Sequence, residues 1–211
     1  MEFFLILGLL ASAFGLVSAK RLSVLIGNFS LQSLLLAILT FVEAVNLGQL
    51  GLCIIALLVL ALKVVIIPKI LSNITKEIKV NDNLEFYLNP QLSLLMALLL
   101  TYLCWTFASV IFVESDAVAK MCGAVSFSMI ALGMFLMIFR VKALAQIIGL
   151  LAMENGVFLL AALVLNGMPF LVEMAIFFDV FVGVVILGVF VYRINRLFVG
   201  IDVSKLNRLR G

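Results

Sequence analysis

The chain has 211 residues, of which 66% are hydrophobic and 12% are charged, and its mean hydropathy is +1.35. Because a soluble domain typically has about 45–50% apolar and about 25% charged residues, this composition excludes a soluble globular protein and indicates an integral membrane protein. The absence of histidine excludes a histidine-ligated haem or metal. The three cysteines lie in separate apolar segments without the paired spacing of a zinc, iron–sulfur or disulfide site.

Seven apolar runs follow one another along the chain. Each has about 18–23 residues, which at about 1.5 Å per residue matches a hydrocarbon core of about 30 Å. Since backbone polar groups must be satisfied inside lipid, we expect these runs to be helices and the protein to be an all-α membrane protein. The seven predicted transmembrane helices cover residues 2–19, 22–43, 47–67, 91–113, 119–139, 144–166 and 170–192.

The first run has to be distinguished from a cleaved signal peptide, because Val17-Ser18-Ala19 resembles a signal-peptidase site. Signal peptides begin with a positively charged region, whereas here Glu2 is acidic and Lys20 and Arg21 follow the run. We therefore expect residues 2–19 to be retained as the first helix.

Positive residues are distributed unevenly between the connections, and this predicts the orientation. Of the 14 Lys and Arg residues, Lys63 lies within a run and Lys120 follows the fourth run. All the others follow the first, third and fifth runs or lie in the C-terminal tail. By the positive-inside rule, the N-terminus is outside and the C-terminus is cytoplasmic.

The connection between the third and fourth runs begins at Pro68, which is expected to end or kink the third helix and to free backbone carbonyl groups near it. Apolar residues recur there at helical spacing and predict a short interfacial helix at the cytoplasmic surface; a solvated linker is the alternative. These residues are Ile67, Ile70, Leu71, Ile74 and Ile78.

An internal repeat is visible when residues 20–39 are compared with residues 142–161 at an offset of 122. Lys20, Leu22, Ile26, Gly27 and Gln32 then meet Lys142, Leu144, Ile148, Gly149 and Glu154. The repeat predicts a parallel 3+1+3 arrangement of helices, as some transporters have; chance similarity between apolar helices is the alternative. The expected parts are residues 1–73 (first three-helix repeat), 74–118 (interfacial segment and linking helix) and 119–211 (second three-helix unit with the tail).

Two carboxyl groups lie near the middle of consecutive predicted helices, Glu154 in residues 144–166 and Asp179 in residues 170–192. A charge at the bilayer centre costs several kcal/mol, so such residues face the protein interior or a water-filled cavity and often carry ions. The pair therefore predicts proton or ion handling, with Asn155 and Gly156 allowing close helix approach beside the acid. The alternative is a neutral glutamate that hydrogen-bonds a neighbouring helix as packing.

Three further polar residues are candidate members of the relay. Lys63 lies about one and a half turns inside the predicted end of the third helix, where it would either extend outward to the interface or pair with a buried carboxylate. Gln32, in the middle of the second run, is a polar station or a helix–helix hydrogen bond. Glu173 precedes Asp179 by six residues and is a candidate exit station.

With these residues the chain resembles the membrane-embedded E subunit of hydrogenase-4, a component of formate hydrogenlyase-type complexes with a group 4 [NiFe] hydrogenase. The matching features, in order, are Gln32-Ser33-Leu34, Lys63 with Pro68, Gln146-Ile147-x-Gly149, Met153-Glu154-Asn155-Gly156, Pro169 with Leu171-Val172-Glu173, Asp179, and Ile201-Asp202-Val203 with Leu206 and Gly211.

Residues 121–211 are also similar to the K subunit of respiratory complex I and the C subunit of Mrp antiporters. The K subunit has its first acid where this chain has Leu151, and Glu154 follows three residues later. Asp179 replaces the second glutamate of that subunit. The role of the acid therefore does not transfer directly.

The resemblance implies a non-catalytic subunit of a membrane arm in the cytoplasmic (inner) membrane, packed between antiporter-like subunits and the hydrogenase module. The nickel–iron site and the iron–sulfur clusters are expected in partner subunits, with no cofactor in this chain. Glu154 and Asp179 are the expected relay, extended by Lys63, Gln32 and Glu173. The alternatives are a structural anchor of the same complex, a component of a cation/proton antiporter assembly, and a free-standing transporter.

Overall fold

The computed structural model describes residues 2–48, 50–77, 84, 89–113, 116–161 and 183. The chain divides into two compact units, Met1–Ala175 and Ile176–Gly211, and every described residue except Gly183 belongs to the first. The predicted all-α class is confirmed. The helices are α1 (Glu2–Ser18), α2 (Leu22–Leu47), α3 (Leu50–Val59), the π-helix η1 (Leu60–Ile66), α4 (Ile67–Glu77), α5 (Pro90–Ile111), α6 (Ala117–Phe139) and α7 (Ala143–Leu159).

Helices lie within each of the first six predicted runs. Residues 162–166 of the sixth run lie outside the described residues, as does the seventh run, 170–192, apart from Gly183. Within the described residues, four segments are long and apolar enough to cross a membrane: Leu22–Asn46, Ala56–Asn73, Gln91–Ile111 and Ala117–Phe139. The apolar helices Glu2–Ser18 and Ala143–Leu159 are shorter. The seven-span count, the orientation, the repeat and the three expected parts stay predictions.

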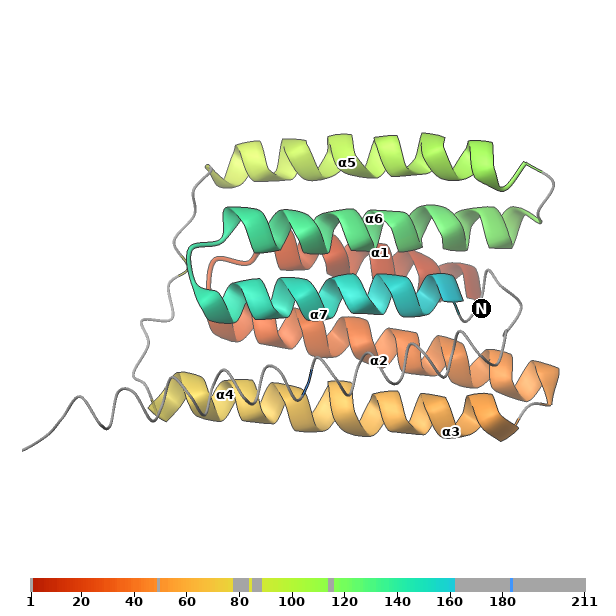
Figure 1. The fold of residues 1–211 in the computed structure, drawn as a ribbon, viewed down its shortest axis with the longest axis horizontal. Coiled ribbons are helices and arrows are strands. Elements are labelled where there is room, and N and C mark those ends of the chain that lie inside the picture. The colour runs from red at the N-terminus through yellow and green to blue at the C-terminus, as the bar shows by residue number, and fades with distance from the viewer. Residues whose placement is uncertain are drawn as a thin grey trace, which may run out of the picture. The chain divides into compact units, whose positions relative to one another are not determined.

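The helices of the first unit run side by side along one direction (Figure 1). Helix α6 packs against α5, α1 and α7, while α2 packs against α1, α7 and the rod formed by α3, η1 and α4. The interior is filled by large aliphatic and aromatic side chains such as Phe29, Leu36 and Met129. Helix α5, at one edge in Figure 1, exposes Leu95, Leu98, Tyr102 and Val110. In a membrane this apolar face lies against lipid or another chain.

Glycines bring α6 and α7 into direct backbone contact. A Cβ atom added to Gly149 would lie 2.9 Å from the carbonyl oxygen of Gly133, and one added to Gly156 would lie 2.9 Å from the carbonyl oxygen of Ser126. Gly149 and Gly156 are seven residues apart, as are Ser126 and Gly133, so each pair lies on one face of its helix. Small residues at such spacing are the usual means of close helix packing in membranes.

The segment after the third run differs from the prediction, because Pro68 does not end the helix. α3, η1 and α4 follow one another without a break from Leu50 to Glu77, and Figure 1 shows α3 and α4 in one line. Pro68 is the second residue of α4, where its missing N–H is compatible with a helix that resumes α-helical hydrogen bonding. The predicted helix is therefore present as α4, as an extension of the third helix, while its location at the membrane interface stays a prediction.

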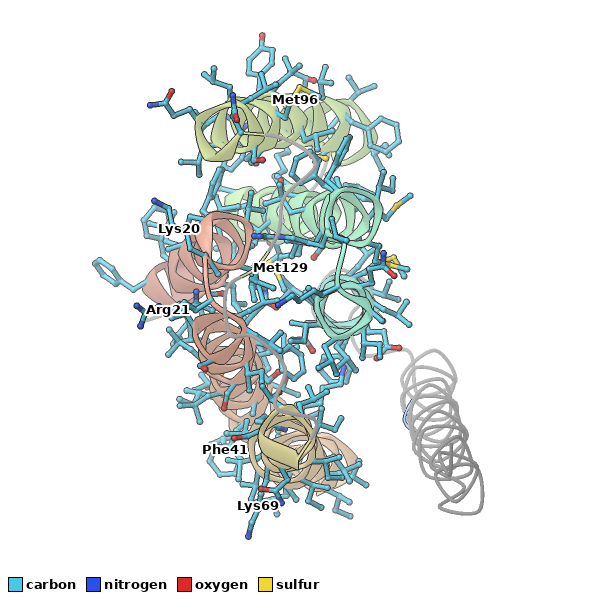
Figure 2. All side chains as sticks on the ribbon, turned by 90° about the vertical axis from the view of Figure 1, so that its left-hand side faces the viewer. Lys20, Arg21, Phe41, Lys69, Met96 and Met129 are labelled. Carbon is cyan, nitrogen blue, oxygen red and sulfur yellow. The ribbon has the colours of Figure 1, made fainter. Side chains whose placement is uncertain are left out.

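The two ends of the bundle carry different charges. The α1–α2 and α6–α7 connections lie at the same end in Figure 1, and they hold Lys20, Arg21, Arg140 and Lys142. Figure 2 looks along the helices from this end and labels Lys20, Arg21 and Lys69 around its rim. At the opposite end, Asn46 Nδ2 donates a hydrogen bond of 3.4 Å to the Glu2 carboxylate. We call the first of these the cationic end.

The glycine contact generates a stability prediction. We expect Gly149→Val to lower the unfolding free energy by about 1–3 kcal/mol, because the added atoms overlap the backbone of α6. The measurement is thermal unfolding of the full chain in detergent micelles. Gly27→Val is the matched control, since Gly27 is exposed on α2 and has nothing within 4 Å of its Cβ position. Equal losses in both variants would mean that the close approach of α6 and α7 is not stabilising.

Candidate functional site

Glu154 lies in the interior of the bundle, in the second half of α7. It is 3% exposed, and in the described part of the chain the other buried charged side chains are Lys63 and Arg140. Gly156, two residues further on, holds this part of α7 against α6. The close helix contact and the burial of the acid therefore occur in the same turns of α7.

Lys63 is the partner of this acid. Its Nζ lies 3.8 Å from Glu154 Oε2, and both side chains are almost completely buried. The distance is that of an ion pair and exceeds the 2.7–3.2 Å typical of an N–H···O hydrogen bond. Because α3, η1 and α4 are continuous, Lys63 lies well inside the segment Ala56–Asn73. The structure therefore shows pairing of Lys63 and not extension of its side chain toward the interface.

Asn155 connects the pair to α2. Its Oδ1 accepts a hydrogen bond of 3.0 Å from Lys63 Nζ. Its Nδ2 donates to Gln32 Oε1 at 3.3 Å and to Ser33 Oγ at 3.1 Å. Asn155, Gln32 and Ser33 are all fully buried. Five side chains from α2, η1 and α7 thus form one polar cluster, which we call the Lys63–Glu154 cluster: Gln32, Ser33, Lys63, Glu154 and Asn155.

The π-helix η1 presents Lys63 to this cluster. Single π-helical turns interrupt α-helices rarely and often occur at functional sites. Val64, next to Lys63, is four residues before Pro68, which has no N–H to donate to the Val64 carbonyl. That carbonyl instead accepts a hydrogen bond of 3.2 Å from the Ser30 hydroxyl of α2. The proline thus frees a carbonyl group that ties η1 to α2 next to the cluster.

The cluster brings together three of the five candidate relay residues, Glu154, Lys63 and Gln32. The other two, Asp179 and Glu173, lie outside the described residues. Of the expected packing residues, Gly149 and Gly156 contact α6 directly, and Pro68 acts through Val64. Asn155 was expected to assist packing and to form a local hydrogen bond, whereas in the structure it hydrogen-bonds Lys63, Gln32 and Ser33 of two other helices.

Arg140 is a buried charge that the sequence analysis did not single out. It follows α6 at the cationic end and is 2% exposed. Its Nη2 donates to the carbonyl oxygens of Val17 at 2.8 Å and Ala19 at 3.0 Å, with Leu16 at 3.4 Å. Burial lowers the pKa of Arg140 to about 10, which leaves the guanidinium charged at neutral pH. A cation at the C-terminal carbonyls of α1 satisfies groups that the helix itself cannot pair.

The Lys63–Glu154 cluster contains groups that can hold and transfer protons. A lysine and a glutamate can each hold or release a proton, and they adjoin an amide that can accept from Lys63 in either protonation state. At 3.8 Å, direct transfer between Lys63 and Glu154 requires a side-chain shift of about 1 Å or a bridging water. In the described residues, no group of three or more Cys, Asp or Glu side chains could hold a metal ion.

The chain is similar in sequence to two kinds of known protein. Hydrogenase-4 component E of Escherichia coli (strain K12) is 28% identical over 149 residues, which are 71% of this chain and 69% of that protein. The same protein of Shigella flexneri matches equally. This chain is similar to hydrogenase-4 component E. The similarity supports the resemblance seen in the sequence, while the likeness to the complex I K subunit stays a prediction.

An uncharacterized protein of Mycobacterium tuberculosis is 25% identical over 204 residues, which are 96% of this chain and 93% of that protein. The alignment therefore extends over nearly the full length of both chains. No family model and no solved structure matches the chain.

The Lys63–Glu154 pair generates a test of coupling. We expect Lys63→Met to lower the unfolding free energy by about 3–5 kcal/mol, because it leaves the buried acid beside an apolar side chain. The double variant Lys63→Met/Glu154→Gln should lose about 0.5–3 kcal/mol less unfolding free energy than the sum of the losses in Lys63→Met alone and Glu154→Gln alone. Thermal unfolding of the four proteins in detergent measures the cycle. Strictly additive losses would contradict a direct interaction between the two side chains.

Arg140 generates a second stability prediction. We expect Arg140→Met to lower the unfolding free energy by about 1.5–3 kcal/mol, the usual contribution of hydrogen bonds to a charged group. Arg21→Met is the matched control, because Arg21 is exposed at the same end. Denaturation in detergent compares them, and a control that loses as much as Arg140→Met would contradict the capping role.

Proposed function

We propose that the chain is a non-catalytic membrane-arm subunit of a membrane-bound [NiFe] hydrogenase complex of the formate hydrogenlyase type, and that its buried charges take part in proton or ion translocation coupled to the redox chemistry. The similarity to hydrogenase-4 component E supports a membrane subunit of a hydrogenase complex. The apolar helices support a location in the membrane. The reaction centre and its metal cofactors then belong to other subunits.

The observation that carries the ion-translocation part is the buried contact between Lys63 and Glu154, at 3.8 Å. Burying two charges in an apolar bundle costs several kcal/mol per ion before their attraction is counted. A packing subunit could fill the same volume with apolar side chains at no such cost. Ionisable residues at this depth therefore favour a function that uses their charge.

The proposed relay has its centre at Lys63 and Glu154. Gln32 and Asn155 extend it toward α2, and Asp179 and Glu173 are its proposed continuation outside the described residues. We further propose that the cationic end faces the cytoplasm, following the positive-inside rule, and that the protein is a multi-pass protein of the inner membrane with antiporter-like neighbours.

Two other functions use the same structure differently. A structural anchor would hold the hydrogenase module and carry no ions. The buried pair would then only specify how the helices pack against one another. A subunit of a cation/proton antiporter would carry ions without a redox partner. Co-purification with hydrogenase subunits separates the antiporter from the other two, and the variants below separate the relay from the anchor.

The test uses the assembled complex in sealed vesicles. We expect Glu154→Gln to lower hydrogen turnover or uncoupler-sensitive acidification by at least about tenfold, because glutamine keeps the size and hydrogen bonding of the acid but cannot exchange a proton. Asp179→Asn tests the proposed continuation in the same way. The measurements are hydrogen evolution and the fluorescence of a pH-sensitive dye.

The control is Glu43→Gln, since Glu43 is a half-buried acid of α2 close to the end that holds Glu2. It should leave both activities unchanged, and the subunit composition of each purified complex shows whether assembly is intact. If Glu154→Gln assembles and keeps both activities, the relay is wrong and the anchor function takes its place.

A further inference from the structure

We infer that the ion carried at the Lys63–Glu154 cluster is the proton and not the sodium ion, because the Lys63 ammonium group occupies the position that a sodium ion would need. This inference rests on the proposed function and specifies its substrate. A carboxylate oxygen and an amide oxygen of α7 meet at one buried point, and oxygens of these two kinds are also ligands of metal cations. In this cluster, that point holds Lys63 Nζ, 3.0 Å from Asn155 Oδ1 and 3.8 Å from Glu154 Oε2.

Among the described residues, the side-chain oxygens of Asn155, Gln32 and Ser33 are engaged with N–H donors. Asn155 Oδ1 accepts from Lys63, while Gln32 Oε1 and Ser33 Oγ both accept from Asn155 Nδ2. The amide group of Asn155 thus lies between α2 and η1, with its oxygen toward Lys63 of η1 and its nitrogen toward Gln32 and Ser33 of α2. A sodium ion would have to displace these donors to collect several oxygen ligands, as hard cations require.

Sodium could also use backbone carbonyl groups, and in the described residues the Val64 carbonyl beside Lys63 is engaged as well. Sodium sites in transporters commonly use carbonyl groups of unwound helices. Here the wider turns of η1 are the local irregularity, and the Val64 carbonyl beside Lys63 accepts from the Ser30 hydroxyl. Helix α7 is continuous through Glu154 and Asn155. Its carbonyl groups there point along the helix axis, as in any unbroken helix.

The charge balance favours the proton as well. In the described residues the charged groups buried with Glu154 are Lys63, in contact with it, and Arg140, which binds the end of α1. A sodium ion next to Lys63 would place two positive charges beside one carboxylate, in a medium where like charges repel strongly. A proton avoids this, because it is carried on the existing groups and brings no separate cation into the site.

Each proton step is balanced on the two side chains. A proton that arrives at Glu154 converts its carboxylate to a carboxylic acid, and a proton that leaves Lys63 converts its ammonium to an amine. Transfer of the acidic proton to the amine then restores the ion pair. One proton has entered and one has left, and Asn155 Oδ1 accepts a hydrogen bond from Lys63 throughout.

The experiment compares proton and sodium movement by the intact complex in sealed vesicles. Acidification and uptake of radioactive sodium are followed at trace and at high sodium, with ionic strength held constant by potassium and with or without a protonophore. We expect acidification by the wild-type complex to be equal at both sodium levels. We also expect acidification to be lost in Glu154→Gln and in Lys63→Gln, which keeps an N–H donor to Asn155 without the charge.

Lys120→Gln is the control for Lys63→Gln, because Lys120 is outside the cluster and donates to the Val113 carbonyl at 2.8 Å. Acidification that requires sodium in the wild-type complex overturns the inference even if the variants fail to assemble. Sodium uptake that survives the protonophore and is lost in Glu154→Gln also overturns it, while the proposed relay stands. If Glu154→Gln changes neither ion flux nor turnover, the proposed function fails and the inference fails with it.

Discussion

A buried positive charge and a buried negative charge in an apolar bundle constrain everything around them. Lys63 and Glu154 come from different helices, and each would be strongly destabilising alone in this interior. The amide of Asn155, the hydroxyl of Ser33 and the π-helical turns of η1 hold the two charged side chains close together. The polar contacts join α2, η1 and α7 at defined positions along their lengths, which apolar packing alone specifies less strictly.

The glycine contacts between α6 and α7 also help to hold the buried charges in place, because they fix the position of the α7 backbone. Gly149 and Gly156 fix α7 against α6 on one side, while Asn155 faces α2 on another. The acid therefore lies on a helix that is held from two directions. A charge pair at 3.8 Å depends on such support, since a small shift of either helix would change both its electrostatic energy and its capacity to pass a proton.

The sequence was sufficient for the helical class and for the approximate positions of the first six helices, because hydrophobic runs are local signals. It was insufficient for the pairing. Lys63 was placed near a helix end because Pro68 normally stops a helix, and only the continuous rod of α3, η1 and α4 shows it at the level of Glu154. The hydrogen bonds of Asn155 and Arg140 could not be predicted because their partners lie 92 to 124 residues away in the sequence.

Arg140 also has a consequence for how the protein is made. Its guanidinium binds carbonyl oxygens that precede it by 121 to 124 residues. A chain is synthesised from its N-terminus, so the end of α1 emerges long before the group that neutralises it. Until α6 and the connection after it have been inserted, water or lipid head groups must solvate those carbonyls. The C-terminal end of the first helix is therefore completed only after most of the described chain has been synthesised.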